Sequence, residues 1–160
     1  MRLAALYSYD VIDSEREDAF DDLTRLAAHV CHAPIAAISL TEDTREWFKS
    51  TLGMDLTETP IDHAFSAHAI LDPSTPLIVS DTLQDPRFQD NELVHGTPGI
   101  RFYAGIPLID ASGFALGTLS VIDVEPRTIQ PEQVEMLRSL ARQAVAQIQL
   151  RKANRSLRKQ

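Results

Sequence analysis

Residues 100–123 constrain the fold of this chain more than any other stretch of its sequence. Two apolar runs, each containing β-branched and aromatic residues, flank a turn of small and polar residues at 110–113. Gly113 can adopt the positive φ that a tight connection needs, so the pattern predicts an antiparallel β-hairpin. Polar residues stand among the apolar ones in both runs. One face of the hairpin can therefore be buried while the other meets a ligand or a helix.

Length and composition indicate one domain with a sizeable core, since the chain has 160 residues, 44% of them apolar. The only cysteine, Cys31, excludes an intrachain disulfide and suits a reducing compartment. No apolar run approaches the roughly 20 residues of a membrane span, and the N-terminus lacks the pattern of a signal peptide. These features predict a cytoplasmic protein without a membrane span.

Charge is distributed unevenly along the sequence. Residues 1–135 carry 8 Lys and Arg against 23 Asp and Glu, whereas residues 136–160 carry seven basic residues and no acidic one. The acidic body argues against nucleic acid as a partner. The basic C-terminal stretch, which includes Arg158 and Lys159, is interpreted as a solvated helix face.

The periodicity and the turn signals predict the following elements outside the hairpin. A capping box, Ser14 with Glu17, begins a helix over about residues 15–31. Strands are predicted at 35–40, 45–52 and 77–80, with an irregular link at 53–60 and a short helix at 65–71. Residues 81–99 form a loop with at most one or two helical turns, and a long helix begins at Pro131. Strands joined by short turns, with helices at the chain ends, indicate an α+β fold.

The predicted fold has an antiparallel sheet with the terminal helices on one face. The short middle helix and the long loop are left for the opposite face, and we expect a ligand pocket between them and the sheet. The C-terminal helix carries an apolar stripe at alternating steps of three and four, namely Val134, Leu137, Ala141, Ala144 and Ile148. Such a stripe resembles that of a coiled coil, and the register meets arginines beyond Ile148. We therefore expect the helix to continue out of the domain or to pair with its copy in a dimer.

Seven motifs in order resemble the GAF domain, a small-molecule sensor module of bacterial signalling proteins. They are residues 20–28 (FDDLTRLAA), 34–40 (PIAAISL), 47–50 (WFKS), 65–70 (FSAHAI), 85–91 (DPRFQDN), 101–108 (RFYAGIPL) and 116–123 (LGTLSVID). The resemblance implies a sheet of five or six strands, a GAF domain over residues 1–150 and a signalling helix over 131–160. It also implies a homodimer through the terminal helices and an effector domain downstream, such as a histidine kinase or a diguanylate cyclase.

Matching by position, the resemblance implies a set of pocket residues on the sheet, the short helix and the long loop. They are Trp47, Phe65, Ser66, His68, Asp81, Arg101, Tyr103, Thr118 and Ser120. Arg101 has two equally supported roles, a bidentate clamp for a carboxylate or phosphate and a salt bridge to an acid of the loop. The acidic body speaks against an anionic ligand, and the long loop around residues 85–91 has no Gly-rich phosphate cradle, so no motif supports nucleotide binding.

Catalytic and cofactor roles receive little support from the residues. Methionine sulfoxide reduction, which some GAF proteins perform, needs a second thiol to resolve the oxidised cysteine, and Cys31 is alone. A bilin needs a pocket cysteine where this chain has Ser66. A single axial histidine suffices for haem, which makes His68 a candidate, but a hydrogen-bonded structural histidine is the expected role. His29 and His32 lack further ligands for a metal site.

The sequence therefore predicts a non-catalytic sensory domain that binds an unknown small molecule and relays its state through the C-terminal helix. The alternative is a ligand-free dimerisation module, with a pocket filled by its own side chains such as Trp47, Phe65 and Phe102. An enzyme is the third interpretation, against which the single cysteine and the lack of a nucleophile–base pair count.

Overall fold

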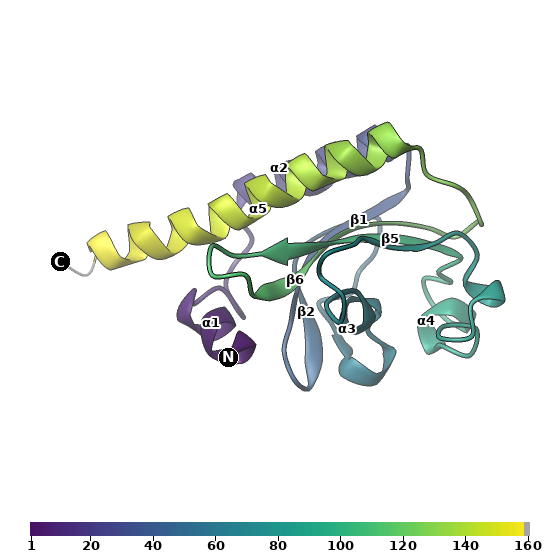
Figure 1. Ribbon diagram of the computed structural model, residues 1–160, viewed down its shortest axis with the longest axis horizontal. Coiled ribbons are helices and arrows are strands. Elements are labelled where there is room, and N and C mark those ends of the chain that lie inside the picture. The colour runs from purple at the N-terminus through teal and green to yellow at the C-terminus, as the bar shows by residue number, and fades with distance from the viewer. Residues whose placement is uncertain (159–160) are drawn as a thin grey trace.

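The computed structural model describes residues 1–158, and within them it shows one six-stranded antiparallel sheet covered by helices (Figure 1). The strands are β1 (Ile35–Thr41), β2 (Arg45–Leu52), β3 (Glu58–Pro60), β4 (Leu77–Val79), β5 (Phe102–Ile109) and β6 (Ala115–Asp123). The helices are α1 (Arg2–Ser8), α2 (Asp18–Cys31), α3 (Phe65–Ala69), α4 (Glu92–His95) and α5 (Pro131–Arg158), with single 3-10 turns η1 (Ile61–His63) and η2 (Thr82–Gln84). The predicted C-terminal helix includes Lys159 and Gln160, but these two residues and the side chain of Arg158 lie outside the described part of the chain.

The sheet has the order β3-β2-β1-β6-β5-β4, and every neighbouring pair is antiparallel. The predicted hairpin is formed by β5 and β6, which pair along their whole length, and β6 is one of the two central strands. Its turn closes as expected: Gly113 has a φ of 91°, and the Asp110 carboxylate accepts from the amides of Ser112 (3.0 Å) and Phe114 (2.9 Å). The predicted α+β class and antiparallel sheet are confirmed.

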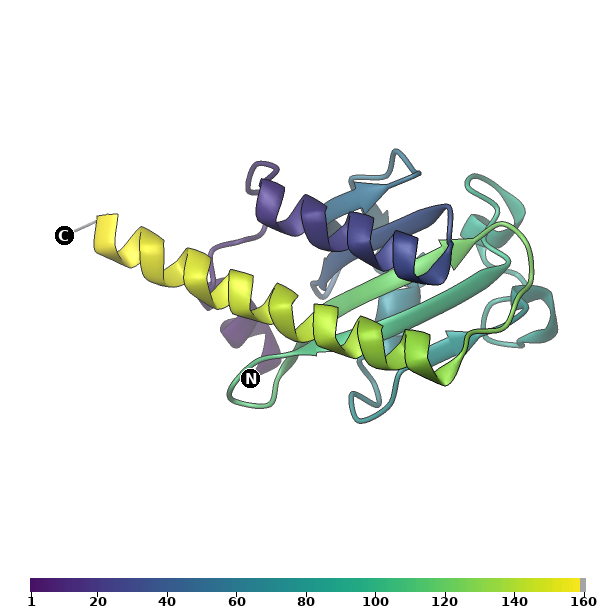
Figure 2. The same ribbon diagram turned by 90° about the horizontal axis from the view of Figure 1, so that it is seen from above.

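The helices divide between the two faces of the sheet. Helices α2 and α5 lie side by side and antiparallel on one face, whereas α3 and α4 lie on the other (Figures 1 and 2). The larger core lies under α2 and α5 and includes Phe20, Leu23, Leu40, Leu119 and Leu137. The face that the sequence left for the short helix and the long loop carries a second, smaller core. This division confirms the predicted layering.

The apolar stripe of α5 is used inside the chain itself. Leu137, Ala141, Ala144 and Ile148 are buried in the larger core, against α2 and the sheet. The distal part of α5 extends past the edge of the sheet (Figure 2). Because the stripe is already covered, a partner helix would have to contact a different face of α5. That face carries Met136 (51% exposed), Leu150 (51%) and Leu157 (66%).

The prediction that a Ser14–Glu17 capping box begins α2 is wrong. The helix begins at Asp18, three residues later than expected, and its N-cap residue Glu17 makes no capping hydrogen bond. The Ser14 hydroxyl donates to the backbone carbonyl of Val11 (2.5 Å) and accepts from Lys49 (2.8 Å). The Glu17 carboxylate is also bound by Lys49. A buried ammonium from β2 has thus taken both groups of the expected capping box, because a tertiary ion pair is stronger than a local cap.

Two elements were not predicted from the sequence, α1 and β3. Helix α1 buries Leu6 in the larger core, and its Arg2 side chain donates to the Thr41 carbonyl at the end of β1 (2.6 Å). Strand β3 lies within the predicted irregular link and pairs with the start of β2. Both elements are too short for a hydrophobic period to reveal them, so tertiary contacts decide that they form.

Candidate functional site

The smaller core lies between the sheet, α3 and residues 81–100, where the sequence predicts a pocket. Buried apolar side chains from the sheet, α3 and the loop meet there: Ile35, Phe65, Ala69, Leu77, Val79, Phe88, Val94, Ile100, Tyr103 and Ile122. The loop supplies Phe88, which is completely buried, through a turn in which the Asp85 carboxylate accepts from the Arg87 amide (2.9 Å). The loop is therefore packed as part of the domain.

Three aromatic rings fill most of this space. The Phe65 ring stacks on Phe88 with centroids 4.2 Å apart and lies 4.9 Å from Tyr103. The Tyr103 ring lies across Gly105, where an added Cβ would come within 2.6 Å of the ring carbon Cε1. Only a glycine allows the ring to lie so close to the sheet. The aromatic filling is consequently built into β5 itself.

A small inner cavity remains beside these rings. Its volume is about 10 Å³, and its walls are Glu46, Phe48, Met54, Leu56, Phe65, Leu93, Ile100, Tyr103, Ser120 and Ile122. Space of that size holds at most about one water molecule. A much larger outer cleft of about 730 Å³ opens to solvent along residues 51–57, Arg16, Thr97 and Pro98. Met54 and Leu56 line both spaces, so these two side chains separate the inner cavity from the outer cleft.

The floor of the inner cavity is polar, although its walls are apolar. Glu46 of β2 is 5% exposed, and the hydroxyls of Ser39 and Ser66 face its carboxyl. The Thr41 hydroxyl donates to Ser66 (3.0 Å), so the Ser66 proton is free to point towards Glu46. The hydroxyls of Ser39 and Thr118 also lie within hydrogen-bond distance of each other (3.2 Å). A buried carboxyl group thus lies in a ring of hydroxyl groups.

Burial raises the pKa of Glu46, and the hydroxyls of Ser39 and Ser66 offset only part of that rise. Burial likewise raises the pKa of Tyr103 far above its usual range, with the negative charge of Glu46 adding to the effect. The Tyr103 hydroxyl approaches that of Thr118 at 3.4 Å, which links it to the same ring. Burial therefore favours the neutral form of both acidic groups of the floor.

Five of the nine predicted pocket residues come together at the inner cavity. Phe65, Tyr103 and Ser120 line it, and Ser66 and Thr118 belong to its ring of hydroxyls; the five side chains come from α3, β5 and β6. All five are at least 98% buried. The structure thus brings these five predicted residues together, whereas Glu46 and Ser39 of the floor and Phe88 of the aromatic filling were not among the residues predicted.

Three further predicted residues lie around the smaller core without lining the inner cavity. The Arg101 guanidinium forms an ion pair with Asp81 (3.1 Å), and Asp81 also accepts from the Leu83 amide at the start of η2. The salt bridge, rather than a free clamp, is the arrangement of Arg101 in the structure. His68 contacts the edge of Phe88 at 4.8 Å, and burial together with the nearby Arg87 lowers its pKa.

Trp47 is the ninth predicted residue, and the structure places it elsewhere. It is buried in the larger core with Phe102, on the face that α2 and α5 cover. The expectation that Trp47 and Phe102 fill the pocket is therefore corrected; Phe65 alone of the three does so. Glu46 and Phe48 flank Trp47 in β2 and lie on the cavity face instead. Because side chains alternate along a strand, the sequence could have placed Glu46 and Phe48 on the same face of β2. Only the register of the sheet shows which helices cover that face.

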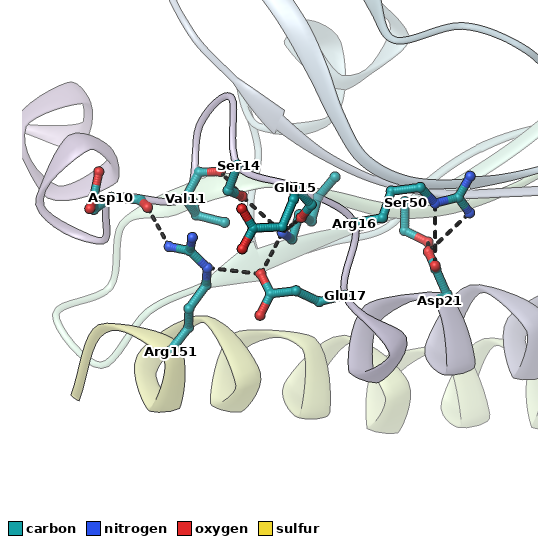
Figure 3. A network of polar contacts seen from close by, with 10 residues as sticks. Asp10, Val11, Ser14, Glu15, Arg16, Glu17, Asp21, Ser50 and Arg151 are labelled. Carbon is teal, nitrogen blue, oxygen red and sulfur yellow. Dashed lines mark hydrogen bonds and ion pairs between the residues drawn. The ribbon is translucent and has the colours of Figure 1, made fainter. Parts of the chain in front are cut away.

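A polar network on the opposite face connects β2 to α5 (Figure 3). The Lys49 side chain has no exposed surface, and its ammonium donates to Glu17 (2.5 Å), to Ser14 (2.8 Å) and to the Glu15 carbonyl (2.5 Å). The same Glu17 oxygen accepts from Arg151 of α5 (2.8 Å). Burial raises the pKa of Glu17, but the hydrogen bonds from Lys49 and Arg151 outweigh that effect and lower it.

A β-bulge makes this connection possible. The pairing of β1 with β2 shifts by one residue, so Ser39 faces Phe48 whereas Ile38 faces Ser50. Lys49 and Ser50 can then both reach the helix side of the sheet, where Ser50 donates to Asp21 (2.6 Å). Arg151 also donates to the Asp10 carbonyl, and Arg155 forms an ion pair with the Asp10 carboxylate (3.0 Å). The distal part of α5 is thus held by polar contacts where its apolar stripe ends.

Within the part of the chain that the structure describes, no three His, Cys, Asp or Glu side chains converge as they would around a metal ion. Cys31 is buried at the end of α2, and burial raises the pKa of its thiol. None of the helices in residues 1–158 combines the length and the apolar character needed to cross a membrane.

Comparison with known proteins identifies the family. The sequence model of the GAF domain family matches residues 15–148 of this chain. A protein of Pseudomonas aeruginosa named as a cyclic di-GMP phosphodiesterase is 39% identical over 148 residues, which make up 92% of this chain and 25% of that protein. The chain therefore spans about a quarter of the length of this relative. The similarity to this relative and the match to the GAF family model both cover the part of this chain that forms the sheet and the inner cavity.

Solved structures agree in fold. The GAF domain of a phosphoenolpyruvate-protein phosphotransferase from Acinetobacter superposes with a TM-score of 0.69 at 14% identity, covering 95% of this chain and 93% of that one. The second GAF domain of DevS from Mycobacterium smegmatis gives 0.64 at 17% identity, covering 88% and 97%. With the family match over most of the chain, these findings show that the chain belongs to the GAF domain family, a signalling sensor fold.

Proposed function

We propose that this GAF domain is the non-catalytic sensory part of a longer signalling protein. In this proposal it binds a small molecule at the inner cavity and relays the bound state through α5 to an effector domain. The domain occupies residues 1–150 and the signalling helix residues 131–160, so that the helix belongs to both. The name of the Pseudomonas relative supports an effector that acts in cyclic di-GMP turnover.

The observation that carries this proposal is the position of β2 between the two sites. One face of β2 presents Glu46 and Phe48 to the inner cavity, and the other presents Lys49 to Glu17. Glu17 in turn binds Arg151 of α5. A displacement of β2 caused by a ligand would change a buried ion pair that holds the output helix. Such a relay requires that the ligand favours one of two arrangements of α5.

The proposed ligand site consists of the inner cavity and the side chains that close it. Phe65, Ser66, Tyr103, Thr118 and Ser120 form its contact surface, with His68, Asp81 and Arg101 around it and Trp47 contributing only through the far side of the sheet. Because the present cavity holds at most about one water, binding must move Met54 and Leu56 and enlarge it. The outer cleft is the route by which a ligand reaches it.

Native mass spectrometry of the purified chain tests the ligand site. We expect one small molecule per chain, released when the chain is unfolded, and stabilisation of the chain by the same molecule when it is added back. Ser120→Leu fills the inner cavity and should abolish both effects, whereas Ser74→Leu, at an exposed position, should leave them unchanged. A bare mass, with no thermal shift across a panel of metabolites, would refute a ligand-binding role.

A ligand-free dimerisation module is the second candidate, and the filled interior favours it. Phe65, Phe88 and Tyr103 leave a cavity of only about 10 Å³. In either case we infer that the chain forms a homodimer through its terminal helices, because Met136, Leu150 and Leu157 are exposed on α5. Leu150→Glu should convert a dimer to a monomer in light scattering coupled to size-exclusion chromatography, with Gln149→Glu as the neighbouring control. A wild-type monomer at all concentrations would contradict the dimer.

A further inference from the structure

The Glu46 carboxyl group lies at the floor of the inner cavity, and no cationic side chain of the described residues pairs with it. It is 5% exposed and lines the cavity together with Tyr103 and Ser120. Burial and two serine hydroxyls are the influences on its ionisation, and no Lys, Arg or His of the described residues is among them. The buried Lys49, three residues further along β2, binds Glu17 on the other side of the sheet. Strand β2 thus carries two buried ionisable groups, Lys49 with an ion-pair partner and Glu46 without one among the described residues.

An unpaired carboxylate is costly in an apolar core, because it loses its hydration and gains no counter-charge. A hydrophobic residue of similar volume would fill the same space beside Phe48 and Phe65 without that cost. The hydroxyls of Ser39 and Ser66 stabilise either protonation state of a carboxyl, since a hydroxyl both donates and accepts. What the site lacks is a cation, and the inner cavity lies where a cation could meet the carboxylate.

We propose that the inner cavity takes a small cationic ligand, a primary ammonium or an amidinium on a compact apolar body, whose charge pairs with Glu46. This inference rests on the proposed ligand-binding function and names the chemical class of the ligand. The apolar body replaces part of the contact among Phe65, Tyr103 and Met54. The faces of the two aromatic rings also attract a cation. The net negative charge of the chain favours the approach of a cation over that of an anion.

Binding of such a ligand is coupled to a proton. Burial raises the pKa of Glu46 in the free domain, whereas a paired cation favours the carboxylate in the complex, so binding releases a proton wherever the free carboxyl is protonated and strengthens as the pH rises. The groups that face Glu46 from the neighbouring elements are hydroxyls: Ser39 and Thr41 of β1, Ser66 of α3, Thr118 and Ser120 of β6, and Tyr103 of β5. Of these, Tyr103 alone titrates, and it stays protonated through neutral pH.

Three probes of nearly equal shape and different charge test the proposal. They are benzylamine, benzyl alcohol and benzoate, titrated into the isotopically labelled chain while the amide resonances of Glu46, Ser66 and Tyr103 are followed by NMR. We expect benzylamine to shift these resonances with an affinity at least about tenfold greater than that of benzyl alcohol, and benzoate to bind most weakly. The affinity for benzylamine should rise as the pH is raised above the ordinary glutamate pKa of about 4.3, because the pKa of Glu46 is raised in the free domain.

Glu46→Gln keeps the shape of the side chain and removes its charge. We expect this variant to bind benzylamine at least about tenfold more weakly than the wild type and benzyl alcohol within about twofold. Glu125→Gln makes the same change of net charge at an exposed position and should leave both affinities unchanged. If Glu46→Gln does not fold, the order of the three probes on the wild type and its pH dependence decide the matter.

The outcomes separate this inference from the function on which it rests. If benzyl alcohol or benzoate binds at the cavity as tightly as benzylamine, the cavity is a ligand site but the cationic class is wrong. Equal binding of benzylamine to the wild type and to Glu46→Gln refutes the class in the same way. If none of the three probes shifts the cavity resonances at millimolar concentration, the cationic class is refuted, whereas the ligand site is decided separately by the retained mass and the thermal shifts across the metabolite panel.

Discussion

Replacing Glu17 by Gln removes the one negative charge that two buried cations share. The carboxylate oxygen lies 2.5 Å from the Lys49 ammonium and 2.8 Å from the Arg151 guanidinium. The Lys49 side chain is entirely enclosed, and that of Arg151 is 8% exposed. A glutamine has nearly the same shape, so the change affects the charge rather than the shape of the site.

The size of the effect follows from the burial of the three groups. Removing one partner of a buried ion pair costs about 3–5 kcal/mol, because the other charge is left without compensation. Glu17 itself is 32% exposed, and the water near it reduces the loss to about 2–3 kcal/mol. The Phe20 ring, 5.2 Å from the ammonium, continues to face Lys49 in the variant. For a domain of this length, the loss lowers the melting temperature by roughly 4–12 °C.

Urea unfolding at neutral pH measures the loss directly. Glu15→Gln is the matched control, since it changes the net charge equally, while only the backbone carbonyl of Glu15 contacts Lys49; we expect an effect under about 0.5 kcal/mol. Adding Lys49→Met to Glu17→Gln removes the uncompensated ammonium, so the double variant should be more stable than the sum of the single effects by at least about 1 kcal/mol.

The same variant also tests the role of α5. Hydrogen exchange in residues 149–157 should become faster in Glu17→Gln, because Arg151 no longer holds this part of the helix to α2. The pKa of Glu17 is lowered in the folded state. Its contribution to the free energy of unfolding is therefore fully present above the ordinary glutamate pKa of about 4.3 and is lost as the pH falls below that value. If Glu17→Gln behaves like Glu15→Gln in stability and exchange, the carboxylate does not link β2 to α5 and the relay fails with it.

Three further changes have expected outcomes. Gly105→Ala places a methyl group against the Tyr103 ring and should destabilise the domain by about 1–3 kcal/mol with shifted Tyr103 ring resonances; an unmoved ring would contradict the close approach. Glu46→Gln should match the wild type in stability in mild acid and exceed it increasingly as the pH rises. The reason is that the pKa of Glu46 is raised in the folded state, so the wild type becomes less stable as the pH rises through that pKa, whereas the glutamine does not titrate. Parallel stability profiles of the two proteins would show that Glu46 is not desolvated. Arg101→Ala breaks a half-exposed pair with Asp81 and should cost under about 1 kcal/mol in thermal unfolding, whereas a larger loss would indicate a buried role.

Part of the candidate site could be predicted from the sequence, because it lies on elements with clear local signals. The hairpin places Tyr103, Thr118 and Ser120 on one face by simple alternation, and the short helix carries Phe65 and Ser66. The pocket position of Glu46 could not be predicted in this way. Its neighbour Trp47 appears the better ligand contact by residue type, yet it lies in the larger core. Residue type says what a side chain can bind and not which face of a sheet it occupies.

The sequence by itself determined the longer elements, the antiparallel character of the sheet and the division of the helices between its two faces, but not α1 or β3. Those features follow from local periodicity, turn chemistry and short connections, which are properties of neighbouring residues. Tertiary structure alone decided the bulge that turns Lys49 and Ser50 to the same side, and the diversion of Ser14 and Glu17 from a helix cap to a buried ammonium. It also decided that the aromatic rings fill the pocket around Glu46. These outcomes depend on competition between residues far apart in the chain, where burial makes one contact stronger than the local alternative.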